Sequence, residues 1–238
     1  MSSAYLFPGQ GSQHVGMGLE LYQNTPEARA VFDQADKQLG FALSVLCFEG
    51  PEETLTDTVN EQAAWFVTSL AMWQRMQAQG WEMPAYMAGH SLGELSALTA
   101  AGALSFSDGL SLVRQRGELM KAAGEREPGA MAAILALDIP TVKAICEQAS
   151  DENSSVQVAN DNCPGQVVIS GDETALTRAM TLAEEAKARK VVKLPITIAA
   201  HSKLMASAAE AFAQAVDARP IQAQAVPVIA TVKAQPLT

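Results

Sequence analysis

The sequence holds only three cysteines among its 238 residues. Cys47, Cys146 and Cys163 are odd in number and widely separated, so they predict neither a disulfide framework nor a metal site. The chain also lacks the basic start and apolar core of a signal peptide, and no apolar run approaches the length of a membrane span. We therefore expect a cytoplasmic protein that contacts no membrane and holds no metal or cofactor.

Positive charge is scarce as well. Lys and Arg number 16 against 26 Asp and Glu, which gives a formal net charge of −10. Binding to nucleic acid needs a cationic surface, so we exclude nucleic acid as a partner. The chain has neither G-x-G-x-x-G nor G-K-[ST], so its glycine-rich loops do not carry the motifs typical of a nucleotide-binding site.

Apolar material, by contrast, is ample. Hydrophobic residues make up 48% of the chain and charged residues 18%, as in globular proteins with a packed core. Aromatic residues are only 5% and alanine is abundant, which favours helix-rich packing. The length suits one large domain or one domain that carries a smaller insertion.

The stretch 85–97 carries the clearest chemical signal. An apolar run is followed by Gly89-His90-Ser91-Leu92-Gly93 and then by good helix formers. This strand, turn and helix order with G-x-S-x-G is typical of a nucleophile elbow, in which Ser91 stands at a helix N-terminus. The N–H of Leu92 is the natural first donor to an oxyanion.

The outer parts of the chain predict a parallel sheet with helices on its faces. We expect a strand at 4–7, followed by the turn Gly9-Gln10-Gly11, whose Gln10 N–H can face a neighbouring cleft. Helical patterns cover 18–40, with a second helix starting at Pro26, and 54–80. Another helix is capped by 106–108, and a polar break follows at 125–129.

Strand and helix patterns alternate in the middle of the chain. We expect strands at 131–137, 156–160, 166–170 and 191–194, with helices at 139–149 and 173–188. This β-α-β-β-α-β order is ferredoxin-like. A helix at about 204–216 and a strand at 226–232 follow. The predicted domains are 1–127 with 196–238, and the insertion 128–195.

Ser91 needs a base, and the chain offers three histidines. His90 is adjacent to Ser91 on an extended turn, so its side chain should point away, and His14 follows a flexible loop. His201 remains as the candidate. Asp217 is the only aspartate after it, so a backbone carbonyl can orient the imidazole instead, which gives a dyad rather than a triad.

Five motifs together carry a family resemblance. They are 7–13 (FPGQGSQ), 89–94 (GHSLGE), 115–117 (QRG), 160–171 with Asn162, and His201-Ser202 with Leu204-Met205. In this order they resemble the malonyl-CoA:acyl carrier protein transacylases, the acyltransferases of fatty acid and polyketide synthesis. The resemblance covers the chain from Tyr5 to about Met205.

The resemblance implies an α/β fold, in which an α/β-hydrolase-like parallel-sheet subdomain carries an inserted ferredoxin-like subdomain. It implies that Ser91 is the acyl-accepting nucleophile, His201 the base and Arg116 the cation that binds the malonyl carboxylate. Backbone N–H groups of Gln10 and Leu92 correspond to the oxyanion donors, and Gln62 and Asn162 to residues of the substrate site. The implied partners are malonyl-CoA and phosphopantetheinylated acyl carrier protein.

Two positions depart from the family pattern. Ala200 stands where relatives carry Phe or Ser before the histidine, so a branched malonyl unit can be tolerated beside it. Ala230 and Thr231 stand where relatives commonly have Asn or Gln, in the region whose carbonyl orients the histidine. Relatives also continue beyond this point, so the sequence leaves open whether Thr238 is the natural terminus.

A carrier protein is acidic and needs a basic landing site. The dense cationic cluster of this chain is the predicted docking site: Lys187, Arg189, Lys190, Lys193 and Lys203. We expect a monomer. The alternatives are a trans-acting polyketide acyltransferase that accepts branched units, a serine acyl hydrolase, and a non-catalytic docking subunit, although the retained Ser91, His201 and Arg116 argue against the last.

Overall fold

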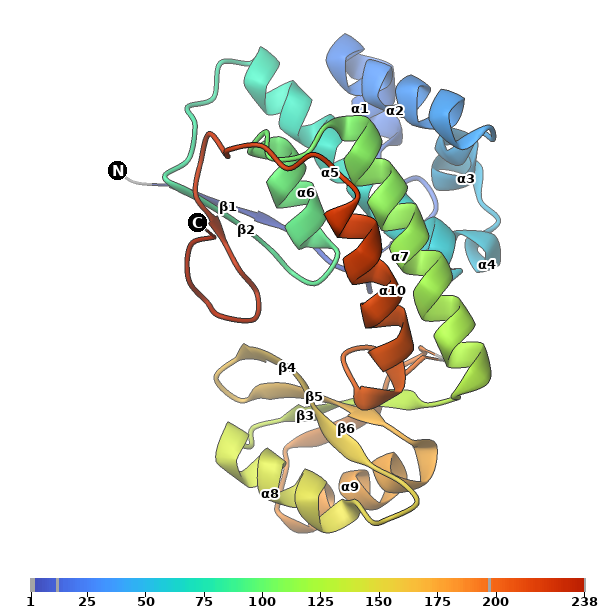
Figure 1. Cartoon of the computed structure of the whole chain (residues 1–238), viewed down its shortest axis with the longest axis vertical. Coiled ribbons are helices and arrows are strands. Elements are labelled where there is room, and N and C mark those ends of the chain that lie inside the picture. The colour runs from blue at the N-terminus through green and yellow to red at the C-terminus, as the bar shows by residue number, and fades with distance from the viewer. Residues whose placement is uncertain (1–2, 12, 197, 238) are drawn as a thin grey trace. The chain divides into compact units, whose positions relative to one another are not determined.

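The computed structural model describes residues 3–11, 13–196 and 198–237, which form two compact units (Figure 1). Unit 1 comprises Met1–Glu118 and Gln214–Thr238, and unit 2 comprises Leu119–Ala213. The sequence places the boundaries near 127 and 196, so the structure assigns more of the chain to the second unit. Packing explains the difference, because Met120, Ala123, Met205 and Ala208 lie in a core cluster of unit 2.

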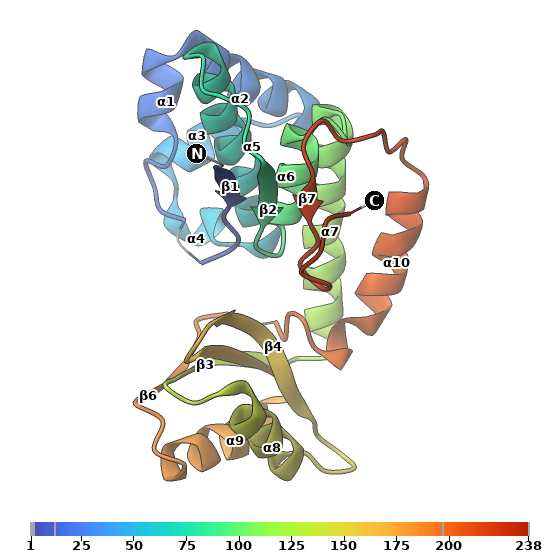
Figure 2. The same cartoon turned by 90° about the vertical axis from the view of Figure 1, so that its left-hand side faces the viewer.

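Unit 1 is built on a parallel sheet of three strands, β1 (Ala4–Phe7), β2 (Tyr86–Gly89) and β7 (Val228–Ile229). β2 lies in the middle, where Phe7 pairs with Gly89 and Met87 pairs with Val228 (Figure 2). The last strand is shorter than the predicted 226–232. Both turns of the predicted site, at 8–11 and 90–92, therefore follow the carboxyl ends of neighbouring strands.

Helices surround this sheet. α6 packs against all three strands, and α5 packs against α2 and α6. The helices of unit 1 are α1 (Leu19–Asn24), α2 (Pro26–Leu39), α3 (Leu43–Glu49), α4 (Glu52–Leu55), α5 (Thr58–Ala78), α6 (Gly93–Ala100) and the first part of α7 (Phe106–Arg126).

Three details of these helices differ from the prediction. The stretch 54–80 is not one helix, because the Asp57 side chain accepts the Val59 N–H and starts α5 afresh. α7 is capped by Ser105 rather than by 106–108, since Ser105 Oγ accepts the Asp108 N–H at 3.0 Å. The third difference is α3, which follows the Gly40 turn and has no counterpart in the prediction.

Unit 2 contains the predicted ferredoxin-like arrangement. Its elements are β3 (Ala130–Leu135), α8 (Ile139–Ala149), β4 (Val156–Cys163), β5 (Gln166–Gly171), α9 (Glu173–Glu185) and β6 (Lys190–Lys193). The antiparallel sheet has the order β4-β5-β3-β6, and α8 and α9 cover one face of it (Figures 1 and 2). A short 3-10 turn, Lys203–Met205, then leads into α10 (Ala206–Asp217).

The two faces of this sheet belong to different hydrophobic clusters. On β3, Ala132 and Ile134 face the cluster that includes residues of α8 and α9, whereas Met131 faces the cluster formed with α7 and α10. On β5, Ile169 and Val168 divide in the same way. Because successive strand residues point to opposite faces, a strand buried on both sides loses the apolar and polar alternation of a half-buried strand.

Within residues 3–11, 13–196 and 198–237, no helix has the length and apolar character that crossing a membrane would require. The same residues contain no group of His, Cys, Asp or Glu side chains that could hold a metal ion. All three cysteines are free, and only Cys163 is exposed.

Candidate active site

Ser91 lies at the sharp turn between β2 and α6. Its φ angle is 55°, in the left-handed region that residues other than glycine seldom adopt. Such strain at a polar residue between a strand and a helix is typical of a functional turn. Here the turn sets the hydroxyl at the N-terminus of α6.

The two glycines of the elbow are required by close backbone contacts. A Cβ on Gly89 would lie 1.9 Å from the carbonyl carbon of Gly93, and a Cβ on Gly93 would lie 2.3 Å from the Phe7 oxygen. The His90 N–H also donates to the Phe7 oxygen at 3.0 Å. The end of β2, the start of α6 and the end of β1 thus meet without space for a side chain.

Arg116 of α7 connects Ser91 to α5. Its Nη2 donates to Ser91 Oγ at 2.9 Å, and its Nη1 donates to Gln62 Oε1 at 2.7 Å. Gln62 is fully buried. Burial lowers the pKa of Arg116 to about 10, and the negative charge of Glu94 opposes this shift. Arg116 is therefore still a cation at neutral pH, and it lies directly beside the Ser91 hydroxyl.

Two backbone donors lie next to this group. The N–H of Leu92, at the N-cap of α6, and the N–H of Gln10, after β1, have no hydrogen-bond partner in the described part of the chain. Leu92 is buried, and a Cβ on Gly9 would touch the His90 oxygen at 2.6 Å, so the loop 8–11 lies against the elbow. Unpaired N–H groups at such turns suit an anionic oxygen.

The predicted base belongs to unit 2. His201 is exposed and has a φ angle of 59°, and its carbonyl oxygen accepts a hydrogen bond from Gln157 Nε2 at 3.2 Å. Ala200 is buried in the cluster that includes Met131 and Met205. Asn162 is exposed on β4, where its Nδ2 donates to Gln166 Oε1 at 3.2 Å.

The other two histidines, His14 and His90, are exposed residues of unit 1. Unit 1 thus brings together Ser91, Gln62 and Arg116, and it sets the Gln10 loop against the elbow. His201, Ala200 and Asn162 lie in unit 2. The role of each of these residues stays a prediction.

Two acidic residues of the site region were not predicted. Glu61, beside Gln62 in the first turn of α5, is buried and accepts the Gly11 N–H at 3.2 Å. Glu94, in the first turn of α6, accepts hydrogen bonds from the backbone and hydroxyl of Thr231. One sequence signal was available for Glu61, because it is the only ionisable residue between positions 58 and 74.

Thr231 ties the last strand region to the elbow. Its single hydroxyl hydrogen is shared between Glu94 Oε2 and the Gly89 oxygen, which lies 3.1 Å from Thr231 Oγ1. The neighbouring Ala230 oxygen accepts the Ala234 N–H at 2.8 Å. A threonine at this position therefore supports the nucleophile turn through its side chain.

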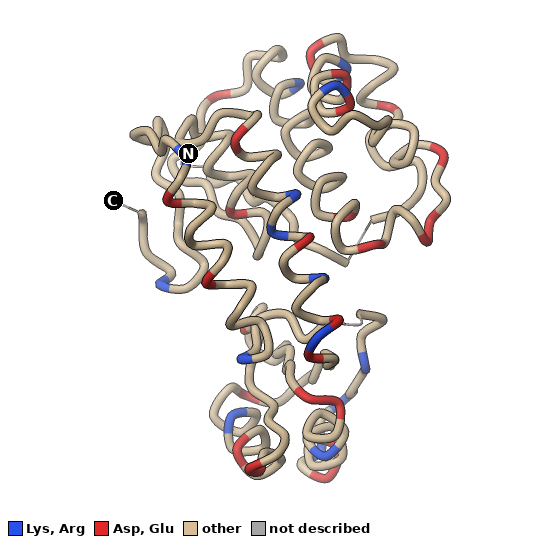
Figure 3. The backbone as a smooth tube through the Cα atoms, turned by 45° about the vertical axis from the view of Figure 1, so that its right-hand side comes forward, with Lys and Arg blue, Asp and Glu red and all other residues tan. Residues whose placement is uncertain are grey.

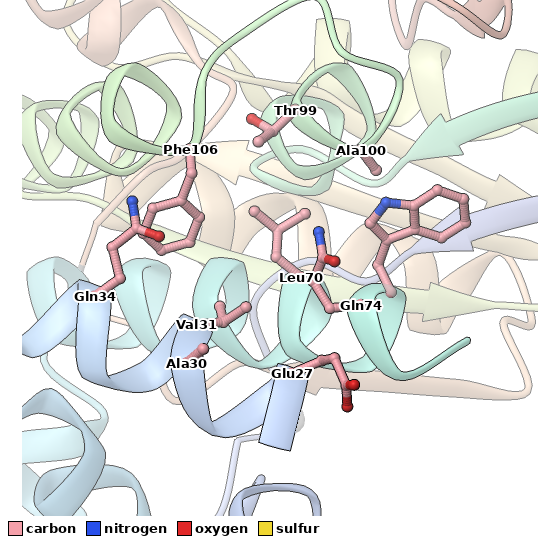
Figure 4. Close-up of a pocket in the computed structure, with 10 residues that line it drawn as sticks. Glu27, Ala30, Val31, Gln34, Leu70, Gln74, Thr99, Ala100 and Phe106 are labelled. Carbon is pink, nitrogen blue, oxygen red and sulfur yellow. The ribbon is translucent and has the colours of Figure 1, made fainter. Parts of the chain in front are cut away.

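A cavity of about 490 Å³ lies elsewhere in unit 1, among α2, α5, α6 and α7 (Figure 4). Its lining includes the polar side chains of Glu27, Gln34, Gln74 and Thr99 and the apolar side chains of Leu70 and Phe106 (Figure 4). None of its lining residues belongs to the predicted site.

The cationic residues predicted to receive a carrier protein are all exposed on unit 2. Lys187, Arg189 and Lys190 follow α9 and lead into β6, Lys193 ends β6, and Lys203 starts the 3-10 turn. Lys193 pairs with Glu173, so its charge is partly neutralised.

Comparison with known proteins gives one family for nearly the whole chain. The acyl transferase domain matches residues 4–238. A malonyl CoA-acyl carrier protein transacylase of Bacillus subtilis is 47% identical over 99% of this chain and 74% of its own length. These matches confirm the family resemblance drawn from the five motifs.

Solved structures agree. A malonyl CoA-acyl carrier protein transacylase of Coxiella burnetii has a TM-score of 0.97 and 39% identity, over 100% of this chain and 75% of that one. A malonyl-transacylase in complex with its type II polyketide acyl-carrier protein has a TM-score of 0.97 and 36% identity, over 100% and 77%. The two-subdomain α/β fold expected from the sequence is thereby confirmed.

Proposed function

Because the chain belongs to the acyl transferase domain family, we propose that it moves a malonyl group from coenzyme A to the phosphopantetheine thiol of an acyl carrier protein. The observation that carries the proposal is the contact of the Arg116 guanidinium with both Ser91 and the buried Gln62. A half-buried cation beside a serine nucleophile suits an acyl group that ends in a free carboxylate. An ordinary ester has no such group, which argues against a serine acyl hydrolase.

In the first half of the reaction, Ser91 Oγ attacks the thioester carbonyl while His201 accepts the hydroxyl proton. The carbonyl oxygen becomes an anion that the N–H groups of Gln10 and Leu92 stabilise. The C–S bond then breaks, and His201 returns the proton to the departing thiolate of coenzyme A. A malonyl ester on Ser91 remains.

The second half uses the same groups in reverse. The carrier-protein thiol attacks the ester carbonyl and gives its proton to His201, and the C–O bond to Ser91 breaks as His201 protonates the serine. No cofactor takes part in either half. Each backbone donor contributes roughly 2.7 to 4 kcal/mol of barrier lowering in comparable sites, which makes the oxyanion contacts the largest single contribution of the site.

Selection of malonyl over acetyl rests on Arg116. A two-pronged, charge-assisted contact with a carboxylate contributes on the order of 1.5 to 3 kcal/mol, which corresponds to roughly a tenfold to hundredfold preference. Gln62 holds one guanidinium nitrogen at 2.7 Å and so limits the directions in which the fork can point. We further propose that Ala200 leaves room for a branched α-carbon.

The carrier protein docks, on this proposal, at the cationic cluster of Lys187, Arg189, Lys190, Lys193 and Lys203. Acidic residues outnumber basic ones along the chain, so a local basic surface is needed to attract an acidic partner (Figure 3). The solved relative in complex with its acyl-carrier protein supports the class of partner. We propose that the enzyme acts in the cytoplasm as a monomer.

Intact-mass spectrometry tests the proposed function. Mixed with malonyl-CoA alone, the protein should gain one malonyl group that maps to Ser91, and the group should move to phosphopantetheinylated carrier protein when this is added. The Ser91→Ala variant is the control and should gain nothing. An adduct that is lost to water equally fast without the carrier would point to a hydrolase, and no adduct would contradict the proposal.

A further inference from the structure

The first turn of α5 contains a buried carboxylate that the mechanism does not use. Glu61 is only 1% exposed. No Lys, Arg or His among the described residues forms an ion pair with it. A carboxylate held away from water without a cation is costly unless hydrogen-bond donors compensate it, so its contacts define its role.

Both donors to Glu61 come from the loop after β1. The Gly11 N–H donates to Glu61 Oε1 at 3.2 Å, and the Gln10 side chain also hydrogen-bonds to the carboxyl group. The Gly11 N–H is shared with Gln13 Oε1 at 3.0 Å. Gly11 has a φ angle of 122°, so this peptide adopts a conformation that L side chains rarely tolerate. Glu61 therefore contacts the loop at Gln10 and at Gly11, on both sides of the peptide bond that joins them.

The other side of the same loop lies against the nucleophile elbow. A Cβ on Gly9 would be 2.7 Å from the Nδ1 of His90, and a Cβ on Gly93 would be 2.7 Å from the Pro8 oxygen. The elbow thus fixes the start of the loop, while Glu61 fixes its far end. The Gln10 N–H, which has no partner in the described part of the chain, lies between these two anchors.

The adjacent residue extends this connection to the reactive hydroxyl. Gln62 accepts a hydrogen bond from Arg116, and Arg116 donates to Ser91. Two consecutive buried residues of α5 therefore hold two parts of the site. Glu61 holds the loop that bears a predicted oxyanion donor, and Gln62 holds the cation beside the nucleophile.

We infer that Glu61 is a positioning residue that holds the Gln10–Gly11 peptide so that the Gln10 N–H faces the oxygen anion formed when Ser91 attacks a carbonyl. The inference rests on the proposed function of Gln10 as an oxyanion donor. Both loop contacts also lower the pKa of Glu61, against the larger rise caused by burial, because they favour the ionised carboxylate.

Variants at Glu61 separate positioning from packing. Glu61→Ala removes the acceptor, and Glu61→Gln keeps a carbonyl acceptor of the same length. Ser69→Ala is the matched control, since Ser69 is a buried polar residue of the same helix whose hydroxyl has no partner among the described residues. Gln10→Ala removes the loop side of the contact but keeps the backbone N–H.

The measurement is the single-turnover rate constant for acylation of Ser91 by malonyl-CoA, alongside the dissociation constant of malonyl-CoA measured with each variant in a Ser91→Ala background. A displacement of about 1 Å costs on the order of a hundredfold in rate. We expect Glu61→Ala to lower the rate constant by roughly 10- to 100-fold, with the dissociation constant changed by less than about twofold. Glu61→Gln and Ser69→Ala should stay within about threefold of the parent, and Gln10→Ala should lose severalfold.

A second reagent makes the result independent of the malonyl substrate. A fluorophosphonate forms a bond from Ser91 Oγ to phosphorus while the P–F bond breaks, fluoride leaves, His201 accepts the hydroxyl proton, and the phosphoryl oxygen occupies the position of the oxyanion. Its rate should fall in Glu61→Ala by a similar factor. If the parent protein gains no malonyl group, the proposed function fails, and the fluorophosphonate rates still decide the role of Glu61.

Three results would overturn the inference. One is an unchanged acylation rate in Glu61→Ala, and another is an equal loss in Glu61→Gln and Glu61→Ala. The third is a parallel loss of rate and malonyl-CoA binding, which would indicate a general disturbance of the fold. If Glu61→Ala does not fold, an unchanged rate in Gln10→Ala would equally overturn it.

Discussion

Arg116 combines a point charge with a flat fork of donors, and both properties matter at its position. In the structure one prong contacts Gln62 and the other contacts Ser91, so the guanidinium plane is fixed before any carboxylate arrives. A lysine can supply the charge but cannot make two parallel hydrogen bonds. On the proposed function, the residue type would therefore contribute to the selectivity for malonyl.

Replacing Arg116 with Lys tests this argument. We expect kcat/KM for malonyl-CoA to fall roughly 10- to 100-fold, while the slow reaction with acetyl-CoA changes far less. Arg114→Lys, two residues away on α7, is the control, because Arg114 pairs with Glu118 near the surface. Equal losses with both acyl-CoA substrates would show that Arg116 does not read the carboxylate.

The raised pKa of Glu61 predicts how the free energy of unfolding changes with pH. Burial raises the pKa of Glu61 from 4.5 to about 7, so the folded state binds this proton more tightly than the unfolded state. The contribution of Glu61 to stability is therefore greatest at low pH and declines as pH rises from about 4.5 to about 7, by about 3 kcal/mol in total.

Urea unfolding of the parent protein and Glu61→Gln at pH 5 and pH 8 measures this effect. The parent should lose about 2.5 kcal/mol more than the variant between these two pH values, because Gln has no proton to release. Identical pH dependence in the two proteins would show that Glu61 titrates near its ordinary pKa in the fold.

At the scale of the elements, the turn between β2 and α6 needs glycine at Gly89 and Gly93 because neighbouring backbone leaves no space for a Cβ. An ordinary turn needs glycine only for its positive φ angle. Gly80 and Gly102 have positive φ angles but open surroundings, whereas Gly89 is confined by the backbone of Gly93. A side chain at Gly80 strains only its own backbone, at a cost of roughly 1 to 2 kcal/mol. A side chain at Gly89 must separate β2 from α6.

We therefore expect Gly80→Ala to fold with a modestly lower melting temperature and full acyl transfer. Gly89→Ala should yield protein that is insoluble or lacks the cooperative unfolding transition. The added Cβ would lie 1.9 Å from the Gly93 carbonyl carbon, a backbone atom that cannot move away as a flexible side chain could. Thermal unfolding followed by circular dichroism distinguishes the two. A Gly89→Ala protein as stable as Gly80→Ala would contradict the close packing of the elbow.

Elements with a regular hydrophobic pattern were predictable from the sequence, and those set by local hydrogen bonds were not. The pattern of 139–149 gives α8 with both ends correct, because Asp138 caps it and apolar residues recur at helical spacing. The contact of Glu61 with the loop after β1 could not be predicted from the helical pattern. A single charge in an apolar helix resembles a solvated residue until the fold shows the Gly11 amide against it.

The site also has one part that local sequence predicts and one part that it does not. The elbow and its glycines follow from local sequence, since a turn between strand and helix involves consecutive residues. The contact of Arg116 with Ser91 joins positions 25 apart, and its contact with Gln62 joins positions 54 apart. Only the family resemblance indicated those pairings, because helical periodicity says which face Arg116 occupies but not what lies opposite it.

For the whole molecule, the distribution of charge decides how an acidic partner can approach a protein with a net charge of −10. Arg189→Glu with Lys190→Glu should raise the KM for carrier protein about tenfold and leave acylation of Ser91 by malonyl-CoA unchanged. Lys37→Glu with Lys143→Glu makes the same change in net charge at exposed positions outside the cluster. If both double variants weaken carrier transfer equally, only the overall charge matters and the docking proposal fails.

The central strand β2 pairs with β7 only long after β2 itself has been synthesised. β7 is made about 140 residues after β2, which at roughly 5 to 20 residues per second means a delay of roughly 7 to 28 s. Unit 2 is synthesised during that interval, while one edge of β2 lacks its partner. A strand with a bare edge invites pairing with other chains. Ribosome-bound chains that stop before Val228 should therefore be the species most in need of a chaperone.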